Sequence, residues 1–300
     1  MIQGPAFNAD SAYTFVERQV NFGPRIPGSP PHNACSHYLY DKLATYGAKV
    51  SVQEFKAESY DGQELDLKNI IASFDFGTPR HLLLAAHWDT RPFADKDTLD
   101  PRKPFDGAND GASGVGVLLE IARLLSAGTH PNTGVDIIFF DGEDDGEPEF
   151  DDQPRGDENS NAMWWCLGSQ HWAKNPHKKN YSAYYGILLD MVGARNAHFY
   201  KEGSSLQFAK KITDHVWHIA ELSGYSDYFI NADSPGITDD HIFINRDTHI
   251  PTIDIIDFDP EQEGSYFPPY HHTHADNMKI IDKNTLKAVG QTLVNVVYNE

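Results

Sequence analysis

Four short apolar segments recur along the chain, and each is followed within a few residues by acidic or histidine side chains. Uninterrupted apolar segments of this length are typical of strands that are buried on both faces of a sheet. Stretches with helical periodicity separate them, and such alternation predicts a mostly parallel sheet covered by helices on both faces. The expected strands are 81–86, 134–140, 184–190 and 252–257, and the expected helices are 34–46, 111–128, 205–223 and 284–298.

Two further segments, 49–59 and 65–74, alternate between apolar and polar residues in the manner of a half-buried hairpin. The predicted fold is therefore a three-layer α/β structure with a mixed, mostly parallel central sheet. The chain contains neither an internal repeat nor a clear linker, so we expect residues 1–300 to form a single domain. One long acidic and turn-rich insertion, at about 144–161, interrupts this pattern and is a candidate calcium site.

The chain is strongly acidic, with 44 Asp and Glu residues against 24 Lys and Arg residues and a formal net charge of −20. This charge argues against a nucleic acid or an anionic membrane surface as the main partner, and it favours metal ions and amine-bearing peptides. No apolar run reaches transmembrane length, and the first residues have no signal-peptide features. Either the protein is cytoplasmic or an exported precursor has been trimmed.

The cysteine content is too low for a disulfide framework, because Cys35 and Cys166 are the only two cysteines. Free thiols are the expected state of both side chains, with at least one of them buried. A single bridge between them remains the alternative. The sequence does not decide between these two states.

Potential metal ligands lie just after the ends of the predicted strands. In open α/β sheets, ligands bind beyond the carboxyl ends of the strands, so these side chains are expected to meet at one edge of the sheet. Zinc suits a mixed set of carboxylate and imidazole ligands, whereas a calcium site would use oxygen atoms alone. The side chains that follow a predicted strand are His87, Asp89, Glu143, Asp144 and Asp190. Further candidates are Asp110 at the start of the predicted helix 111–128, Asp239, Asp240 and His241 before the segment IFI, and His271, His272 and His274 in YHHTHADN.

Five motifs in a fixed order resemble those of the co-catalytic zinc aminopeptidase family. They are HWD at 87–89, NDGASG at 109–114, GED at 142–144, LLDM at 188–191 and HHTHAD at 271–276. Within that family, longer strings resemble the glutaminyl cyclases that are shared by animals and some bacteria. These strings are HWDTRPFADKD, FFDGED, LLDMVGARN and TDDHIFI.

The resemblance implies a zinc-exopeptidase-like fold with one zinc ion per chain, bound by Asp110, Asp144 and His272. It implies that Glu143 is the proton shuttle. Asp190 and Asp239 would form a carboxylate network beside it, and whether Asp239 or Asp240 has this role stays open. The peptide bond between Asp110 and Gly111 would be cis. Many relatives have Glu in place of Asp144, so a water-bridged contact to zinc is an alternative at that position.

The resemblance also implies a substrate pocket with an apolar wall. His87 would line the site without binding zinc. The candidates for the wall are Trp88, Phe93, Trp164, Trp165, Phe267 and Tyr270, of which Phe267 and Tyr270 flank the His272 loop. His271 stands where the animal cyclases have a pocket tryptophan, so their substrate contacts cannot be transferred to it.

The activity that the resemblance implies is that of a glutaminyl-peptide cyclotransferase, which converts the N-terminal Gln of peptides and proteins to pyroglutamate and releases ammonia. Such an enzyme is expected in the periplasm, attached to the outer membrane or secreted, and we expect a monomer. One alternative is a two-zinc aminopeptidase in which His87 and Asp190 hold the second ion. Another is a non-catalytic binding domain on the same fold.

Overall fold

The computed structural model describes residues 4–150, 163–261 and 266–300. Within them, a central sheet of six strands runs in the order β1-β2-β4-β3-β5-β8. Strands β4, β3, β5 and β8 are parallel to one another, whereas β2 is antiparallel to both β1 and β4. The prediction of a mixed, mostly parallel sheet is confirmed, and so is the hairpin at its edge.

The elements have the following bounds. The central strands are β1 (Lys49–Glu58), β2 (Glu64–Phe74), β3 (His81–His87), β4 (Gly134–Phe140), β5 (Gly186–Asp190) and β8 (Thr252–Ile256). The helices are α1 (Ala9–Val20), α2 (Pro30–Thr45), α3 (Ala112–Leu125), α4 (Leu167–Lys174), α5 (Gly203–Leu222), α6 (Asp240–Phe243), η1 (Ile244–Thr248) and α7 (Lys283–Asn299). A separate parallel pair is formed by β6 (Phe199–Lys201) and β7 (Phe229–Asp233).

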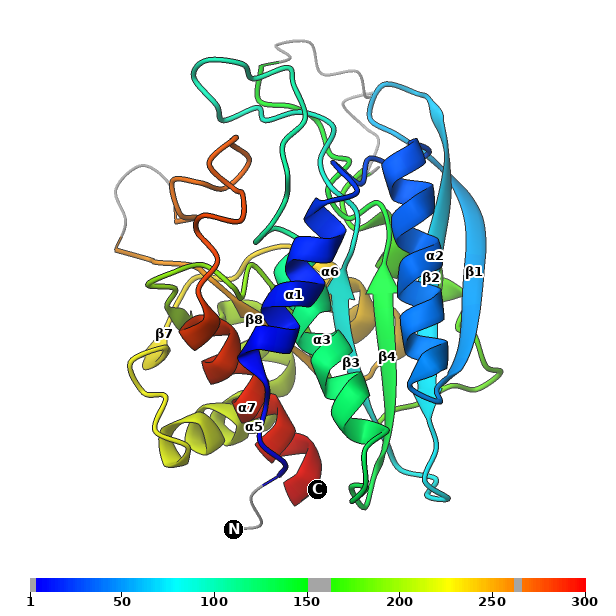
Figure 1. The fold of residues 1–300 in the computed structure, drawn as a ribbon, viewed down its shortest axis with the longest axis vertical. Coiled ribbons are helices and arrows are strands. Elements are labelled where there is room, and N and C mark those ends of the chain that lie inside the picture. The colour runs from blue at the N-terminus through cyan, green and yellow to red at the C-terminus, as the bar shows by residue number, and fades with distance from the viewer. Residues whose placement is uncertain (1–3, 151–162, 262–265) are drawn as a thin grey trace.

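The two faces of the sheet bury different clusters because successive residues of a strand point to opposite sides. In β3, Leu82 and Leu84 belong to the larger cluster, which includes residues of α1, α2, α3, α5 and α7. Leu83 and Ala85 belong to the smaller cluster, with residues of α4 and η1. Full burial of one such leucine contributes about 1.5–3 kcal/mol to stability. Figure 1 shows the resulting layers, with α1, α2 and α3 in front of the sheet.

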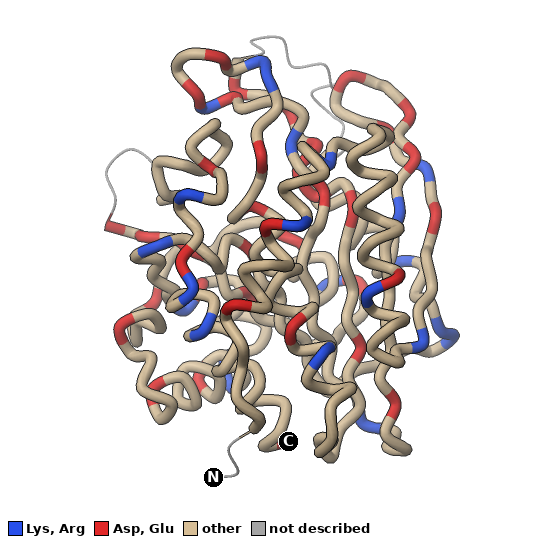
Figure 2. Tube along the Cα trace, viewed as in Figure 1, with Lys and Arg blue, Asp and Glu red and all other residues tan. Residues whose placement is uncertain are grey.

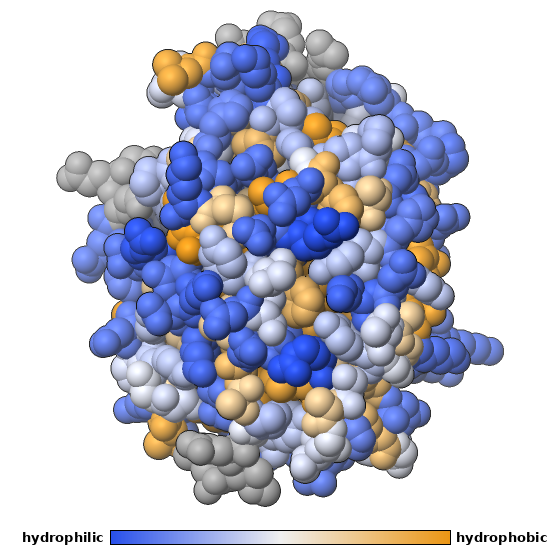
Figure 3. Space-filling view, viewed as in Figure 1, coloured by the Kyte–Doolittle hydropathy of each residue, from blue (hydrophilic) through white to orange (hydrophobic). Residues whose placement is uncertain are grey.

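The surface of the molecule is largely polar. Figure 2 shows Asp and Glu residues over the whole trace, several of them in the loops at the upper end of the view. On the face drawn in Figure 3, apolar residues form only small separate groups. No helix among the described residues has the length and the apolar composition needed to cross a bilayer.

The structure differs from the sequence-based expectations in a few elements. Helix α2 begins four residues before its predicted start because Pro30 and Pro31 occupy its first turn, where a proline needs no amide partner, and Ser29 caps it. The short elements β6, β7, α4 and α6 were not predicted, since they are too short for a clear periodic signal. The acidic insertion is described only as far as Phe150, and residues 151–162 lie outside the described part.

The strands place the functional side chains at one edge of the sheet. Strand β3 ends at His87, its parallel neighbour β4 ends three residues before Glu143, and β5 ends at Asp190. Figure 1 shows the arrowheads of β3 and β4 pointing toward the same end of the molecule. Segments that are far apart in the sequence therefore meet beyond the carboxyl ends of these strands.

Candidate metal centre and active site

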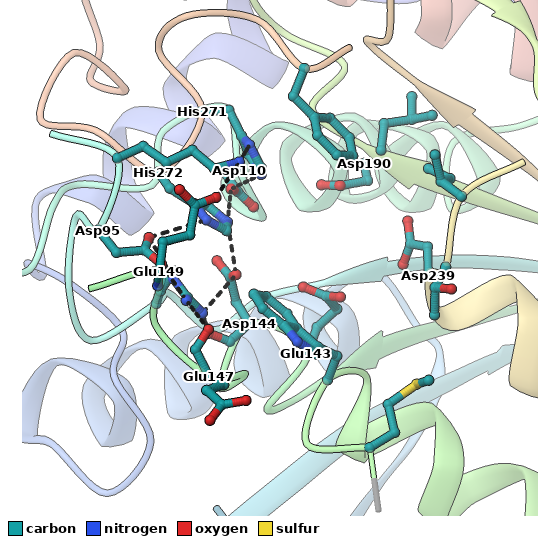
Figure 4. Close-up of a pocket in the computed structure, with 18 residues that line it drawn as sticks. Asp95, Asp110, Glu143, Asp144, Glu147, Glu149, Asp190, Asp239, His271 and His272 are labelled. Atoms are coloured by element: carbon teal, nitrogen blue, oxygen red, sulfur yellow. Dashed lines mark hydrogen bonds and ion pairs between the residues drawn. The ribbon is translucent and has the colours of Figure 1, made fainter. Parts of the chain in front are cut away.

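A cavity of about 390 Å³ opens at this edge of the sheet. Figure 4 shows Asp110, His272 and Asp144 close together, with Glu143 next to Asp144. The lining residues are Arg91, Asp95, Lys96, Asp110, Glu143, Asp144, Glu147, Glu149, Met163, Trp165, Asp190, Ile237, Thr238, Asp239, Ile256, Phe267, His271 and His272. The cavity thus combines a group of carboxylates and imidazoles with an apolar wall, as small-molecule sites commonly do.

The Nε2 atom of His272 is the meeting point of two carboxylates. It lies 3.1 Å from Oδ1 of Asp144 and 3.6 Å from Oδ2 of Asp110. Ligand atoms of a tetrahedral zinc ion are about 3.4 Å apart, as follows from bonds of about 2.1 Å. The second oxygen of Asp144 is buried and has no hydrogen-bond partner, which is costly unless a cation or donor faces it. The donor set and this unpaired oxygen fit a zinc ion.

Asp110 belongs to two clusters of potential ligand atoms, and within each cluster the atoms lie within 4.8 Å of one another. One consists of Asp110, His271 and His272, and the other of His87, Asp110 and Asp190. In the second cluster, Nε2 of His87 lies 3.1 Å from Asp110 and 3.2 Å from Asp190. Asp110 is therefore shared between two potential cation positions. Asp144 lies beside the first of these positions, because its Oδ1 atom contacts Nε2 of His272.

Backbone amides fix the carboxylate-bearing segments. Asp276 accepts hydrogen bonds from the amides of Asn109 and Asp110, at 2.7 and 3.0 Å. Asp89 accepts from the amides of Glu143 and Asp144, both at 3.2 Å. Both carboxylates are buried, so they hold the loops that present the candidate ligands. Asp89 was predicted only as a potential metal ligand and Asp276 had no predicted role, although both belong to the recognised motifs.

The turn into helix α3 requires a glycine after Asp110. Gly111 has a φ of +84°, and an added Cβ would lie 2.9 Å from the Asp89 carbonyl oxygen and from the ring of His87. The peptide bond before it is trans, since the described residues contain no cis bond. The expectation of a cis bond at this position is therefore wrong, because the left-handed conformation of Gly111 turns the chain with a trans bond.

Glu143 faces the cavity beside further acidic groups. Burial, together with the charges of Asp144, Asp239 and Asp240, raises its pKa well above the ordinary range, against the opposing effect of His87. The Cys166 thiol donates a 3.2 Å hydrogen bond to its Oε1 atom. A carboxyl group with a raised pKa can both accept and release a proton near neutral pH.

The neighbouring carboxyl groups also have raised pKa values. Burial and the charge of Asp190 raise the pKa of Asp239 to about 6. Burial raises the pKa of Asp190, with Asp110 adding to the effect and His87 opposing it. Asp239 lines the cavity, whereas Asp240 is buried beneath it and its amide donates to Oδ1 of Asp239. The geometry therefore favours Asp239 over Asp240 for a role at the site.

The predicted aromatic wall is only partly at the cavity. Trp165, Phe267 and His271 line it, and the ring centroids of Phe267 and His271 are 4.4 Å apart, whereas Phe93 and Trp164 are not among the lining residues. Trp88 does not line it: its ring stacks on His32 at 4.3 Å and its Nε1 donates to the Lys68 carbonyl oxygen. The alternation of strand residues explains this, since His87 points to the site and the next residue points away. Tyr270 lies behind the wall, with its hydroxyl donating to Asp257.

The remaining predicted residues have clear positions. His87 lies beneath the cavity, in contact with Asp110 and Asp190, rather than among the lining residues. Both cysteines are free and buried, as expected. Three residues near the site were not predicted, namely Asp95, Arg91 and Lys96, because polar residues on irregular loops give no periodic signal.

Comparisons with known proteins identify the family of the chain. Residues 69–297 match Peptidase family M28. A zinc-dependent exopeptidase from Parabacteroides distasonis is 52% identical with a TM-score of 0.93, over 99% of both chains. Glutaminyl cyclase from Bacteroides thetaiotaomicron, solved with N-acetylhistamine, is 51% identical with a TM-score of 0.93, again over 99% of both chains. A bovine glutaminyl-peptide cyclotransferase-like protein is 28% identical over 84% of this chain, which spans 66% of the bovine protein.

Proposed function

The chain belongs to peptidase family M28, and within that family we propose that it is a zinc-dependent glutaminyl-peptide cyclotransferase. Its substrates are peptides and proteins with an N-terminal glutamine, and its products are N-terminal pyroglutamate and ammonia. The observation that supports this best is the convergence of Asp110, Asp144 and His272 beside the half-buried Glu143 in one cavity. The likeness to a bacterial glutaminyl cyclase over nearly the whole chain supports the same activity.

Asp110, Asp144 and His272 are the proposed ligands of one zinc ion. Asp144 binds directly rather than through water, which its short contact with His272 and its unpaired Oδ2 atom support. Three protein ligands leave one coordination position for the substrate. When bound, the ion acts as a Lewis acid that polarises the γ-carbonyl group of the substrate glutamine.

Glu143 transfers the proton in the proposed reaction. The α-amine nitrogen of the substrate forms a bond to the γ-carbon, and the bond from that carbon to the amide nitrogen breaks. Glu143 accepts one proton from the attacking amine and delivers it to the leaving nitrogen, which departs as ammonia. Because amine and carbonyl belong to one molecule, the five-membered ring closes without a second reactant having to be positioned. Asp190 and Asp239 support Glu143 as a carboxylate network.

A second candidate function is hydrolysis by a two-zinc aminopeptidase. The close cluster of His87, Asp110 and Asp190 favours it, because these groups could hold another ion. The deciding experiment measures zinc per chain together with products from a Gln-peptide and a Leu-peptide. One zinc with ammonia release from the Gln-peptide supports the cyclase. Two zinc ions, with free leucine and no pyroglutamate, would establish the aminopeptidase instead.

Further features of the proposal follow from the same resemblance. We propose one catalytic domain for residues 1–300, a monomeric state, and a location in the periplasm, on the outer membrane or outside the cell, where exported substrates are found. Cell fractionation with an antibody against the chain tests the location. Calcium binding at 144–161 stays a prediction, since most of that segment lies outside the described residues.

A further inference from the structure

Lys96 and His271 meet at the wall of the cavity from two loops that are far apart in the sequence. The Nζ atom of Lys96 lies 2.9 Å from Nδ1 of His271, and both residues line the cavity. The His271 ring also packs against Phe267 at 4.4 Å and against His272 at 3.7 Å, measured between ring centroids. Contacts on three sides therefore fix the orientation of the ring.

The contact with Lys96 determines which nitrogen of His271 bears hydrogen. A lysine ammonium group has only hydrogens to donate and no acceptor, so Nδ1 must be the acceptor. The single ring hydrogen then lies on Nε2. Nε2 is 4.0 Å from Oδ2 of Asp110, which is longer than a hydrogen bond. This N–H group is thus directed at the metal centre without being bonded to Asp110.

Position alone would make His271 a fourth metal ligand. Its ring nitrogen lies within 4.8 Å of the ligand atoms of Asp110 and His272. A histidine binds a metal ion through an unprotonated nitrogen, however, and the contact with Lys96 puts the hydrogen on the nitrogen that faces the centre. Lys96 therefore keeps the fourth position available, which a catalytic zinc site requires.

We infer that Lys96 fixes His271 in the form that cannot bind zinc and that donates its Nε2–H to the γ-carbonyl oxygen of the substrate. This role rests on the proposed cyclase function. Negative charge develops on that oxygen when the amine attacks, and a donor already aimed at it stabilises the transition state. His271 would then make a polar contact with the substrate at the position where the animal cyclases have a tryptophan.

The proposed ligands and the nearest arginine do not offer such a donor. Asp110 and Asp144 are acceptors when ionised. The Arg91 guanidinium is occupied, because it donates to both oxygens of Asp95 and to the carbonyl oxygens of Asp144, Gly146 and Glu147. The Nε2–H group of His271 remains directed at the metal centre.

The test compares Lys96→Met, His271→Phe and the double variant, with Lys96→Arg as the conservative variant. Lys103→Met is the matched control, since Lys103 is exposed and pairs with Asp100 on the same loop. Cobalt(II) replaces zinc, and its visible spectrum reports the ligands, while chelator competition reports zinc affinity. Turnover is measured with the zinc enzyme on a Gln-peptide.

We expect His271→Phe, which keeps a ring but has no donor and no metal-binding atom, to keep the wild-type cobalt spectrum and zinc affinity while turnover falls by about 10²-fold, as for loss of one oxyanion donor. In Lys96→Met, His271 is released to bind the metal, so the cobalt bands shift, zinc binds more tightly and turnover falls. The double variant and Lys96→Arg are expected to have the wild-type spectrum.

Two outcomes would overturn the inference. A changed spectrum and weaker zinc binding in His271→Phe would make His271 a ligand. A wild-type spectrum and wild-type turnover in Lys96→Met would remove Lys96 from any role at the centre. Failure of the proposed cyclase function would be a separate result, seen as release of leucine from a Leu-peptide by the wild-type enzyme. The comparison of cobalt spectra between variants would remain valid in that case.

Discussion

The Oδ1 atom of Asp95 lies 3.4 Å from Nδ1 of His272, on the opposite side of the ring from Nε2, which faces Asp144. A carboxylate at the far nitrogen fixes the orientation of a ligating histidine and makes it more basic. Burial by itself lowers the pKa of His272, but the carboxylates of Asp144 and Asp95 outweigh this effect and raise the pKa to about 9. Asp95 is itself held by two hydrogen bonds from Arg91.

Asp95→Asn is expected to weaken zinc binding by about 10–100-fold, the usual effect of losing a group that supports a ligating histidine. The substitution keeps the shape of the side chain but removes the charge that faces His272 and Arg91. Competition with a fluorescent chelator measures the change. Asp100→Asn, at an exposed position of the same loop, is the control. An unchanged zinc affinity in Asp95→Asn would mean that His272 needs no such support.

Glu143→Gln is expected to keep the fold and one zinc ion per chain but to lower turnover by about 10²–10⁴-fold, because the amide cannot accept and release a proton. Metal analysis, the melting temperature and ammonia release from a Gln-peptide are measured on the same sample. Near-wild-type turnover with full zinc content would remove Glu143 from the mechanism.

Much of the site could be predicted because the strands that lead to it, β3, β4 and β5, are parallel. Neighbouring parallel strands end at the same edge, so polar residues after β3, β4 and β5 had to lie close together. The apolar segments located these strands to within two residues, as with the prediction of 184–190 for β5. His87, Glu143 and Asp190 were found in this way.

The supporting residues could not be predicted by the same argument. Asp95 and Arg91 lie on a loop without regular structure, where spacing along the sequence says nothing about which side chains meet. Their partners, His272 and the carbonyl groups after Asp144, come from distant segments. Trp88 was misplaced for a different reason, since the alternation of strand β3 was not applied to the residue after His87.

Glu202 is expected to make the fold sensitive to acid. Its carboxylate caps helix α5 by accepting from the amides of Ser204 and Ser205, and it accepts from the amide of Ile237 at the cavity. Burial opposes ionisation, but the His241 ring at 3.2 Å and these amides lower the pKa of Glu202 from 4.5 to about 2. Because the folded-state pKa is lowered, its contribution is complete above about pH 4.5 and is lost as pH falls toward 2.

Glu202→Gln tests this contribution. At pH 7 the variant is expected to lose on the order of 3 kcal/mol of stability, because it lacks the charged group whose pKa the folded state lowers from 4.5 to about 2. The difference between variant and wild type should shrink as the pH is lowered from 5 to 3. Denaturant unfolding at a series of pH values measures it, with Glu221→Gln on the exposed side of the same helix as control. A difference that is independent of pH would show that the charge of Glu202 has no part in it.

Asp89→Asn is expected to affect both stability and turnover, since its two oxygens bind the amides of the proposed shuttle and of a proposed zinc ligand. An asparagine has one acceptor oxygen, so one of these buried amides loses its partner, at a cost of about 1–3 kcal/mol. The segment that presents Glu143 and Asp144 then shifts, and a displacement of about 1 Å can lower a rate by about 10²-fold. The melting temperature, zinc content and kcat/KM for a Gln-peptide are the measurements. Asp41→Asn on the exposed face of α2 is the control. A lower melting temperature with unchanged kcat/KM would limit Asp89 to a structural role, because the reacting groups would then have kept their positions without it.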